Sequence, residues 1–562
     1  MQALWHVHPA DPQRADRLAG GLGVDPITAQ LLMNRGIHDR EQAVRFLHPT
    51  LETLGDPCRV PDLAQGVDRL KKAIARREPI LIFSDSDVDG LTASVILYEV
   101  LRELGAVVRA RQSNRIAGGY GLPRTLVHRL SRSSTRLLIL VDCGTNQPED
   151  IRCLRAKGIE TIVIDHHVPL DGWARPYALI NPHRSDGAGK ELCSAGLVLK
   201  VAQALLGGGR RERLAAYFDL AALGTLADCA PLVSENRAIL AEGMPRVVRS
   251  HRPGLRRLCE ATRTYRPEPD HILRRLTPHL NASGRLGDVT AAWKLLLGDA
   301  DEGIDEWMAL TAAAHTVTKQ LHRRIMVEAE EQVNQFHFRD QFVMVVKRQG
   351  WHQGLMGPLA ARLAERYGRP AIALAMDERC GIGSGRSVPL FNLLDALQAC
   401  QGLLVRFGGH AQACGLTIDR SHLEEFCARV NQRARLALGR EGLIKTRLVD
   451  LELPLSAIQP RWVEEAEGLA PFGPCNPRPT VVIRHLAVTV TSPQMATLTD
   501  GTKRMVGKGR FHALAPEGLY DVVATPSLKA GALVLTVSDV RRALPKAEAP
   551  SVETAPWRLA QT

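Results

Sequence analysis

The feature that most constrains this chain is a strand-like run that ends in one acid and two imidazoles. Residues 161–169 read TIVIDHHVP, in which residues 162–164 are typical of a buried strand and Asp165, His166 and His167 follow directly. In open parallel α/β sheets, ligands bind at the carboxyl ends of the strands. The segment therefore predicts a site at such an edge, although a polar turn that caps a strand explains an isolated Asp-His pair about equally well.

Two further apolar runs also end on carboxylates, and helix-like segments separate the runs. The runs are residues 80–83, followed by SDSDVDG, and 137–141, followed by DCGT; the helix-like segments are 92–104 and 149–157. This alternation is the βαβ signature of a parallel sheet. Another acid, Asp228, follows the apolar segment 220–226. The pattern predicts several carboxylates that converge on one edge of a sheet.

Such carboxylates repel one another unless cations lie between them. Oxygen ligands with one or two imidazoles suit Mg²⁺ or Mn²⁺ better than a metal that prefers thiolates. Two such ions about 3.5–4 Å apart are the common arrangement for hydrolysing a phosphoester. A calcium-binding EF-hand loop is excluded for DSDVDG, because Ile96 stands where its twelfth-position glutamate would be.

The four segments DSDVDG, VDCGT, IDHH and LADCAPL resemble, in order, the motifs of the DHH superfamily of phosphoesterases. Within that superfamily the chain resembles the RecJ family of single-strand-specific 5′-to-3′ exonucleases. The resemblance extends over roughly the first 480 residues. It includes LLMNRGI, FLHP, RIAGGYGLP, LINPH, SENR, LNASGRLGD, WHQGLMG, GIGSGRS, FGGHAQACGL and PFGPCNPRP. A DHH triplet alone would be weak evidence, whereas this ordered series is strong.

The resemblance implies an α/β fold in which a parallel-sheet DHH domain is joined by a long helix to a DHHA1 α/β domain, with a C-terminal OB-like β-barrel. We expect a helical lead-in at 1–60, the DHH catalytic domain at 61–250, a helical connector at 251–340, the DHHA1 domain at 341–442, the OB-like domain at 443–544 and a disordered tail at 545–562. The absence of glycine and proline between Gly303 and Gly350 also predicts the long helix. The tail, rich in Pro, Ala and Glu, is typical of disorder.

The resemblance also implies a cofactor of two divalent ions, Mn²⁺ or Mg²⁺. Their expected ligands are Asp85, Asp87, Asp89, Asp142, His166 and Asp228. Among these, Asp142 is expected between the two ions. Asp165 would orient His166 or support the ligands from behind, and His167 would face the scissile phosphate. Hydrolysis of this kind requires no serine or cysteine nucleophile.

Residues that would contact the DNA are implied in three places. A basic loop carries Arg115 and Tyr120, and the polar segment NASGR carries Arg285. Two glycine-rich loops would supply Ser384, Arg386, Ser387, Gly408, Gly409 and His410. Among these, Arg285, Ser384 and Arg386 are the candidates for the 5′-terminal phosphate, since exposed amides and arginine suit phosphate oxygens. Taken alone, a glycine-rich loop is more often just a turn.

Charge and cysteine content limit the partners and the compartment. The net charge of +12 favours a polyanionic partner, although a solvated basic surface explains a modest excess as well. Eleven cysteines without a CxxC pair argue against a disulfide framework or a structural zinc site and favour a reducing cytoplasm. We expect single-stranded DNA as the partner, with a single-strand-binding protein or a helicase as further candidates, no membrane association, and a monomer.

Two other functions stay open at this point. The first is a non-catalytic DHH scaffold of a replication or repair complex. The intact residues of the expected metal site argue against it; they are Asp87, Asp89, Asp142, His166 and Asp228. The second is a hydrolase of short oligonucleotides, which would have no use for a long chain with an OB-like region.

Overall fold

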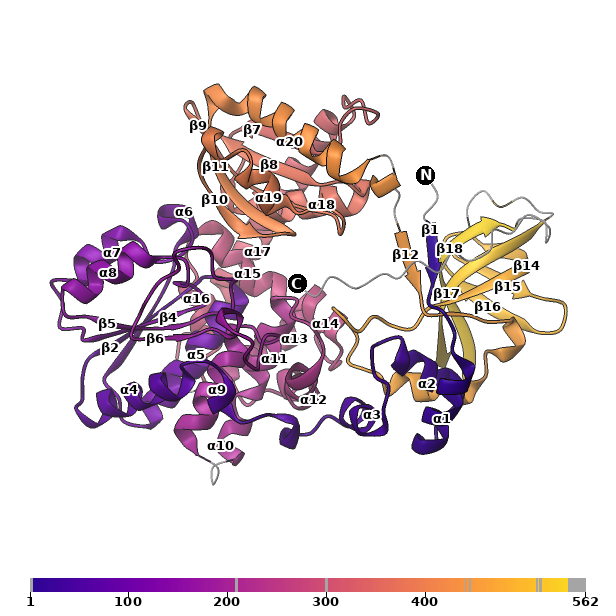
Figure 1. Cartoon of the computed structure of the whole chain (residues 1–562), viewed down its shortest axis with the longest axis horizontal. Coiled ribbons are helices and arrows are strands. Elements are labelled where there is room, and N and C mark those ends of the chain that lie inside the picture. The colour runs from indigo at the N-terminus through magenta and orange to yellow at the C-terminus, as the bar shows by residue number, and fades with distance from the viewer. Residues whose placement is uncertain are drawn as a thin grey trace. The chain divides into compact units, whose positions relative to one another are not determined.

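The computed structural model describes residues 4–207, 211–298, 302–439, 441–443, 446–511, 514 and 518–543 (Figure 1). The chain forms two compact units, one of residues Thr50–Leu443 and the other of Met1–Pro49 with Ile444–Thr562. The predicted disordered tail lies outside the described residues. No helix in the described part of the chain combines the length and the apolar character that a bilayer crossing requires.

The larger unit contains a five-stranded sheet in which every pair of neighbouring strands is parallel. Its order is β3 (Val108–Gln112), β2 (Ile80–Ser84), β4 (Leu137–Val141), β5 (Glu160–Ile164) and β6 (Ala178–Ile180). Alternate residues of β4 enter two different apolar clusters, so both faces of the sheet are covered. This burial explains why the strands are continuous apolar runs rather than alternating ones.

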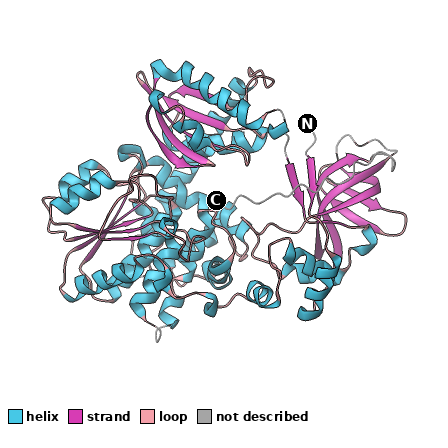
Figure 2. Ribbon diagram, in the orientation of Figure 1, coloured by secondary structure: helices cyan, strands magenta, loops and turns pink. Residues whose placement is uncertain are grey.

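Helices cover both faces of this sheet (Figure 2). One face packs against the first of the two clusters, which includes residues of α4 (Leu63–Ala75), α5 (Val88–Glu103) and α9 (Ser194–Leu206); the other packs with α7 (Arg124–Leu130) and α8 (Pro148–Ala156). Helix α5 begins at Val88, and the predicted start near Thr92 was wrong. The Asp87 carboxylate caps the helix by accepting a hydrogen bond from the Gly90 amide at 3.2 Å, so the acidic motif itself supplies the first turn.

A helical region follows the sheet. It consists of α10 (Arg211–Ala215), α11 (Phe218–Ala227), α12 (Ser234–Val248), α13 (Pro253–Thr262), α14 (Pro269–Arg275), α15 (Thr277–Leu286), α16 (Thr290–Leu295) and α17 (Ile304–Val333). The predicted long helix is confirmed by the 30 residues of α17. The segment NASGR is not a polar insertion but part of α15, where Ala282, Ser283 and Gly284 are buried. Asp228 follows a helix, α11, rather than a strand.

A second sheet completes the larger unit. Its strand order is β10 (Leu404–His410), β11 (Ala413–Asp419), β9 (Cys380–Arg386), β8 (Ala371–Met376) and β7 (Met344–Gln349), with helices α18 (Met356–Tyr367), α19 (Leu393–Gln398) and α20 (Leu423–Leu438). Both glycine-rich segments were predicted as loops, and this was wrong: GIGSGR lies in β9, and GGH and ACG lie in β10 and β11. The glycines let neighbouring backbones approach, because a Cβ on Gly383 would overlap the Ala373 carbonyl oxygen of β8.

Gly383→Ala is therefore expected to lower the free energy of unfolding of the larger unit by about 1–3 kcal/mol, because the backbone of β8 has to move. Chemical denaturation followed by circular dichroism measures this change. Gly402→Ala is the matched control, since a Cβ there meets no atom within 4 Å. Equal stability of the two variants would contradict the packing role of Gly383.

The smaller unit contains a closed barrel. Its strands are β14 (Val481–Ser492), β15 (Met495–Thr499), β16 (Arg504–Lys508), β18 (Ala532–Arg542) and β17 (Leu519–Lys529), and β14 also pairs with β17. Five strands therefore close on themselves, with the short β13 (Leu451–Glu452) beside β14 and helix α21 (Pro460–Glu467) packed against β17. Closure removes exposed strand edges, as in OB-type barrels.

The N-terminal segment is built into this same unit. It comprises β1 (Leu4–Val7), α1 (Pro12–Leu22), α2 (Pro26–Met33) and α3 (Arg40–Leu47), and β1 pairs in parallel with β12 (Thr446–Val449). The Arg35 guanidinium donates to Asn476 Oδ1 at 2.7 Å and forms an ion pair with Asp450 at 3.2 Å. A region expected to lead into the catalytic sheet thus shares its core with the barrel.

Candidate metal centre

The acids and imidazoles of the predicted motifs meet at the carboxyl edge of the first sheet. Three groups of side chains each bring their possible ligand atoms within 4.8 Å of one another; they are Asp142, His166 and His167; Asp89, His166 and Asp228; and Asp85, Asp87 and Asp142. Asp142 follows β4 directly with φ of 61°, a conformation that costs a non-glycine residue energy and is often found at functional sites. The sheet edge thus gathers the six predicted ligands.

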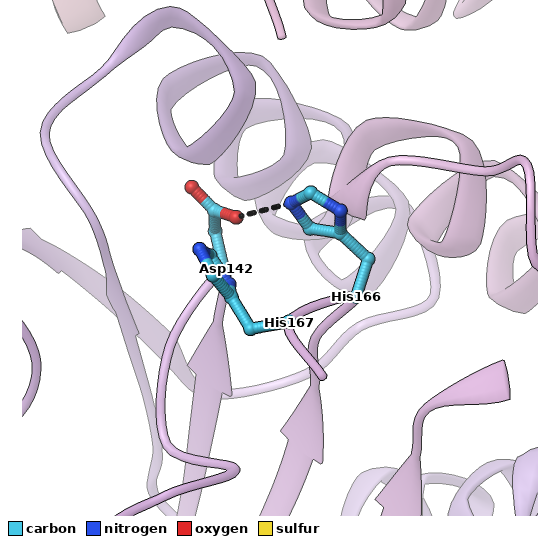
Figure 3. Close-up of side chains that lie close together, drawn as sticks. All are labelled: Asp142, His166 and His167. Atoms are coloured by element: carbon cyan, nitrogen blue, oxygen red, sulfur yellow. Dashed lines mark ion pairs between the residues drawn. The ribbon is translucent and has the colours of Figure 1, made fainter. Parts of the chain in front are cut away.

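His166 lies at the middle of this cluster. Its Nε2 is 3.4 Å from Asp142 Oδ1, 3.8 Å from Asp89 Oδ2 and 3.9 Å from Asp228 Oδ1. Figure 3 shows its ring pointing toward the Asp142 carboxylate, and the His167 ring lies next to it with the two ring centroids 4.7 Å apart. Although burial lowers the pKa of His166, the carboxylates of Asp228, Asp142 and Asp89 raise it well above the usual value.

The carboxylates themselves are crowded. Burial raises the pKa of Asp142 well above its ordinary value, and the Asp87 and Asp89 charges raise it further. Burial likewise raises the pKa of Asp228 to about 7, with His166 opposing and Asp89 adding to the shift. A site that holds so much uncompensated negative charge is suited to divalent cations, which would return these groups to their ionised forms.

Asp85 and Asp87 already have one cationic partner, Arg115. The Arg115 guanidinium contacts the Asp85 carboxylate and lies 2.8 Å from Asp87 Oδ2. Ser113 Oγ also donates to Asp85 at 2.9 Å. Arg115 was expected on a flexible loop, but it begins a short helix, α6 (Arg115–Gly118), capped by Asn114. Asp85 is fully buried and saturated by these donors, so it is less open to an ion than Asp87.

His167 is held by partners on several sides. Its Nδ1 lies 2.7 Å from Asp165 Oδ1 and 3.1 Å from the Tyr120 hydroxyl, and its ring stacks on His410 with centroids 5.2 Å apart. Asp165 thus orients His167, and the expectation that it would orient His166 was wrong. The His167 ring is fixed between residues from both sheets of the larger unit.

Two buried arginines come from different parts of the larger unit, Arg386 from β9 of the second sheet and Arg285 from helix α15. Arg386 donates to Ser384 Oγ at 3.0 Å, and burial lowers the pKa of Arg386, with the charge of Arg115 adding to the effect. Burial and Arg115 also lower the pKa of Arg285. Neither Arg285 nor Arg386 pairs with an acid in the described part of the chain. Guanidinium groups that have no carboxylate partner and lie near another positive charge are suited to bind an anion.

The other predicted phosphate contacts have structural roles in this arrangement. Ser387 Oγ donates to the Phe391 carbonyl at 2.5 Å, and Gly409 adopts φ of 135° where β10 meets β11. A Cβ on Gly408 would meet no atom within 4 Å, so this strand position is open to a ligand. The hairpin that these glycines build is what brings His410 onto His167.

Comparison with known proteins identifies the domains and the family. Residues 79–225 match the DHH family N-terminal domain, residues 340–436 the DHHA1 domain and residues 449–508 the RecJ OB domain. The single-stranded-DNA-specific exonuclease RecJ of Thermus thermophilus is 31% identical over 92% of this chain and 72% of its own length, and that of Escherichia coli is 30% identical over 85% and 88%. The chain belongs to the RecJ family.

Solved structures of RecJ match this chain as well, and one relative is considerably longer than it. The crystal structure of RecJ with Mn²⁺ from Thermus thermophilus matches this RecJ-family chain with a TM-score of 0.82 and 26% identity, over 96% of this chain and 80% of the other. The corresponding Mg²⁺ structure matches with a TM-score of 0.75. The Bacillus subtilis relative is 32% identical, and the chain spans 61% of its length.

The donor set of this RecJ-family chain fits divalent cations such as Mn²⁺ and Mg²⁺. It consists of carboxylate oxygens and imidazole, without a thiolate among the clustered groups, which is the chemistry that these ions prefer. The raised pKa values of Asp142 and Asp228 show negative charge that an ion would offset. The cofactor is therefore divalent metal.

The sequence analysis did not identify the residues that position the site of this RecJ-family chain by donating hydrogen bonds to it. The amides of Ser194 and Ala195, at the start of α9, each donate to Asp89 at 2.8 Å, and Ser194 Oγ donates to Asp142 Oδ1 at 2.9 Å. Asn181 donates to the His167 carbonyl at 2.9 Å. A serine before the apolar run of α9 is a helix-start signal that could have indicated Ser194.

Proposed function

We propose that this chain is a metal-dependent exonuclease that hydrolyses phosphodiester bonds of single-stranded DNA from the 5′ end, in DNA repair and recombination. The observation that carries the proposal is the cluster of Asp87, Asp89, Asp142, His166 and Asp228 at one sheet edge, with His410 of the second sheet against His167. Membership of the RecJ family supports the same substrate.

The residues that would hold two ions are Asp85, Asp87, Asp89, Asp142, His166 and Asp228, with Asp142 shared between both. When bound, two divalent ions activate water and offset charge on the phosphate in hydrolysis. The protein contributes a fixed arrangement of ligands, because Ser194 and Ala195 hold Asp89 and Ser194 holds Asp142 before any ion arrives.

His167 would act on the phosphate. Asp165 and Tyr120 fix its Nδ1 side, which leaves the Nε2 side of the ring to face the phosphate as negative charge grows there. Tyr120 and Arg115 would contact the DNA on the same side. His410 keeps the His167 ring in one plane by stacking on it.

The polarity would follow from Arg285, Ser384 and Arg386, which we assign to the 5′-terminal phosphate. These side chains have no acidic partner among the described residues, and Gly357 leaves room beside Arg386 and Ser384. A phosphate held there would lie at a set spacing from the acids, so the cut would fall near the 5′ end. The barrel would bind the rest of the strand.

The test uses single-stranded DNA labelled at its 3′ end, with a 5′-phosphate or a 5′-hydroxyl, in Mn²⁺ or Mg²⁺, beside a blunt hairpin. We expect shortening from the 5′ end, a preference for the 5′-phosphate, and no cleavage of the hairpin. Arg386→Gln is expected to reduce that preference by about 10–100-fold, because a charge-assisted hydrogen bond is lost. Arg379→Gln, on an exposed turn before β9, is the matched control.

The same assay separates the alternatives. A protein that binds the strand and cleaves nothing with either metal would be the DHH scaffold, and one that cleaves only di- or trinucleotides would be the small-substrate hydrolase. We further propose a cytoplasmic monomer that uses strands exposed by a helicase or held by a single-strand-binding protein. Sedimentation of the purified protein and pull-down with either partner test these points.

A further inference from the structure

A cavity of about 370 Å³ lies between helices α15, α17 and α18, apart from the carboxylate cluster. Its lining comes from Pro278, Arg285, His315, Thr318, Lys319, His322, Pro358, Ala361, Arg362 and Glu365. The cavity shares Arg285 with the group assigned to the terminal phosphate, whereas Ser384 and Arg386 are not among its lining residues. Its volume is within the range of small-ligand pockets, which begins near ~300 Å³.

Two polar atoms on the α17 side of the cavity are buried and have no hydrogen-bond partner in the described structure. Thr318 is 4% exposed, and its Oγ1 is buried without a hydrogen-bond partner within the described structure. The usual partner of a helical threonine is the carbonyl four residues earlier, as Thr316 shows by donating to the Ala312 carbonyl at 2.9 Å. His322 Nε2 is likewise buried without a partner among the described residues. Spacing of three and four residues places His315, Thr318 and His322 on one face of α17.

The charge of the cavity is positive. Arg285, Lys319 and Arg362 line it against one acid, Glu365, which pairs with Arg362 at 3.1 Å. Lys319 has no ion pair with any residue that the structure describes. Burial lowers the pKa of both His315 and His322, and the positive charge of Arg285 adds to the effect. The unpartnered Thr318 hydroxyl and the unbalanced positive charge of this concave site are complementary to a small anion.

We propose that this cavity is a second anion site, which binds the phosphate group of a nucleoside 5′-monophosphate through Thr318, Lys319, His322 and Arg285. The role of the ligand rests on the proposed function, since a nucleoside monophosphate is a product of that reaction. Because Arg285 also belongs to the terminal-phosphate group, an anion in the cavity competes for this guanidinium and weakens the hold on the 5′ end of the strand.

Isothermal titration of the full chain with dAMP, inorganic phosphate or deoxyadenosine, in chelator and without DNA, tests the site. The Arg386→Gln background removes one of the two guanidinium groups assigned to the terminal phosphate and keeps Arg285, which lines the cavity. In it we expect one dAMP to bind, and Thr318→Val with Lys319→Gln to weaken that binding about tenfold or more. Thr316→Val is the matched control, because its hydroxyl bonds within the helix and its side chain is exposed.

Unchanged dAMP affinity in the double variant, or binding of deoxyadenosine as tight as that of dAMP, would overturn the proposal. Inorganic phosphate binding as tightly as dAMP supports an anion site whose ligand is free phosphate. His322→Asn tests the same site if the double variant melts at a lower temperature than its parent. The titration needs no nuclease activity, so failure of the proposed exonuclease function does not change its result.

Discussion

Asp142→Asn is expected to lower the rate of single-strand hydrolysis by about 10³-fold or more, because the residue belongs to two of the three groups of possible metal ligands. Among the described acids, Asp142 alone belongs to two of the three ligand groups, and each of the others belongs to one. The measurement is the release of 5′ nucleotides from phosphorylated single-stranded DNA, together with titration of Mn²⁺ into the metal-free protein.

In the absence of metal, the same substitution is expected to stabilise the folded protein. Asp142 has a raised pKa in the folded state, so ionising it near neutral pH costs folding free energy. The neutral amide removes that cost. We therefore expect Asp142→Asn to raise the melting temperature of the protein in chelator and to abolish the stabilisation that Mn²⁺ gives the wild type.

Asp171→Asn is the control for both measurements, since Asp171 is exposed on the loop after the two histidines. It should keep wild-type hydrolysis and metal response. A variant at Asp142 that hydrolyses DNA at the rate of this control would show that the carboxylate cluster is not the active site.

Arg252→Met is expected to lower the free energy of unfolding by about 3–5 kcal/mol, because it leaves buried carboxylates without their counter-charge. Arg252 is fully buried, with Nη1 2.9 Å from Glu99 Oε1 and Nε 3.2 Å from Asp219 Oδ2. It also donates to the Leu296 carbonyl at 2.9 Å. This one side chain therefore joins α5, α11 and the end of α16 behind the catalytic sheet.

Urea denaturation of the full chain measures the loss, with Arg257→Met as the matched control. Arg257 pairs with Asp305 at 3.0 Å on the surface, where such pairs contribute about 0–1 kcal/mol. Adding Asp219→Asn to Arg252→Met should recover part of the stability, since it removes one of the stranded charges. Equal losses for the two arginine variants would show that the buried network does not support the fold.

The parallel sheet and the long helix were predictable because their signals are local. The runs at 80–83, 137–141 and 162–164 are buried on both faces and so stay apolar throughout, and α17 contains no residue that breaks a helix. The acids at the ends of these strands were predictable for the same reason: the carboxyl ends of parallel strands share an edge. All the residues clustered there had been chosen as candidates.

Predictions failed where the role of a residue depends on which other segment of the chain packs against it. The glycines of GIGSGRS predict a loop by themselves, yet in β9 they admit the backbone of β8. Asp165 precedes two histidines in the sequence. The conformation of the turn after β5 determines that its carboxylate contacts His167. The sequence of residues 1–49 does not indicate which part of the chain they pack against, because their apolar faces would fit many surfaces.

The sequence by itself thus determined the alternation of strands and helices in the first sheet, the long helix, the chemistry of the acidic edge and the family. These depend on composition and on hydrophobic periodicity, which can be recognised within short segments. The tertiary structure alone decided that the N-terminal segment packs with the barrel, that Ser194 holds two of the acids, and that Thr318 faces a positive cavity without a partner among the described residues. These depend on contacts between segments far apart in the chain, whose geometry arises only when the backbone has closed around them.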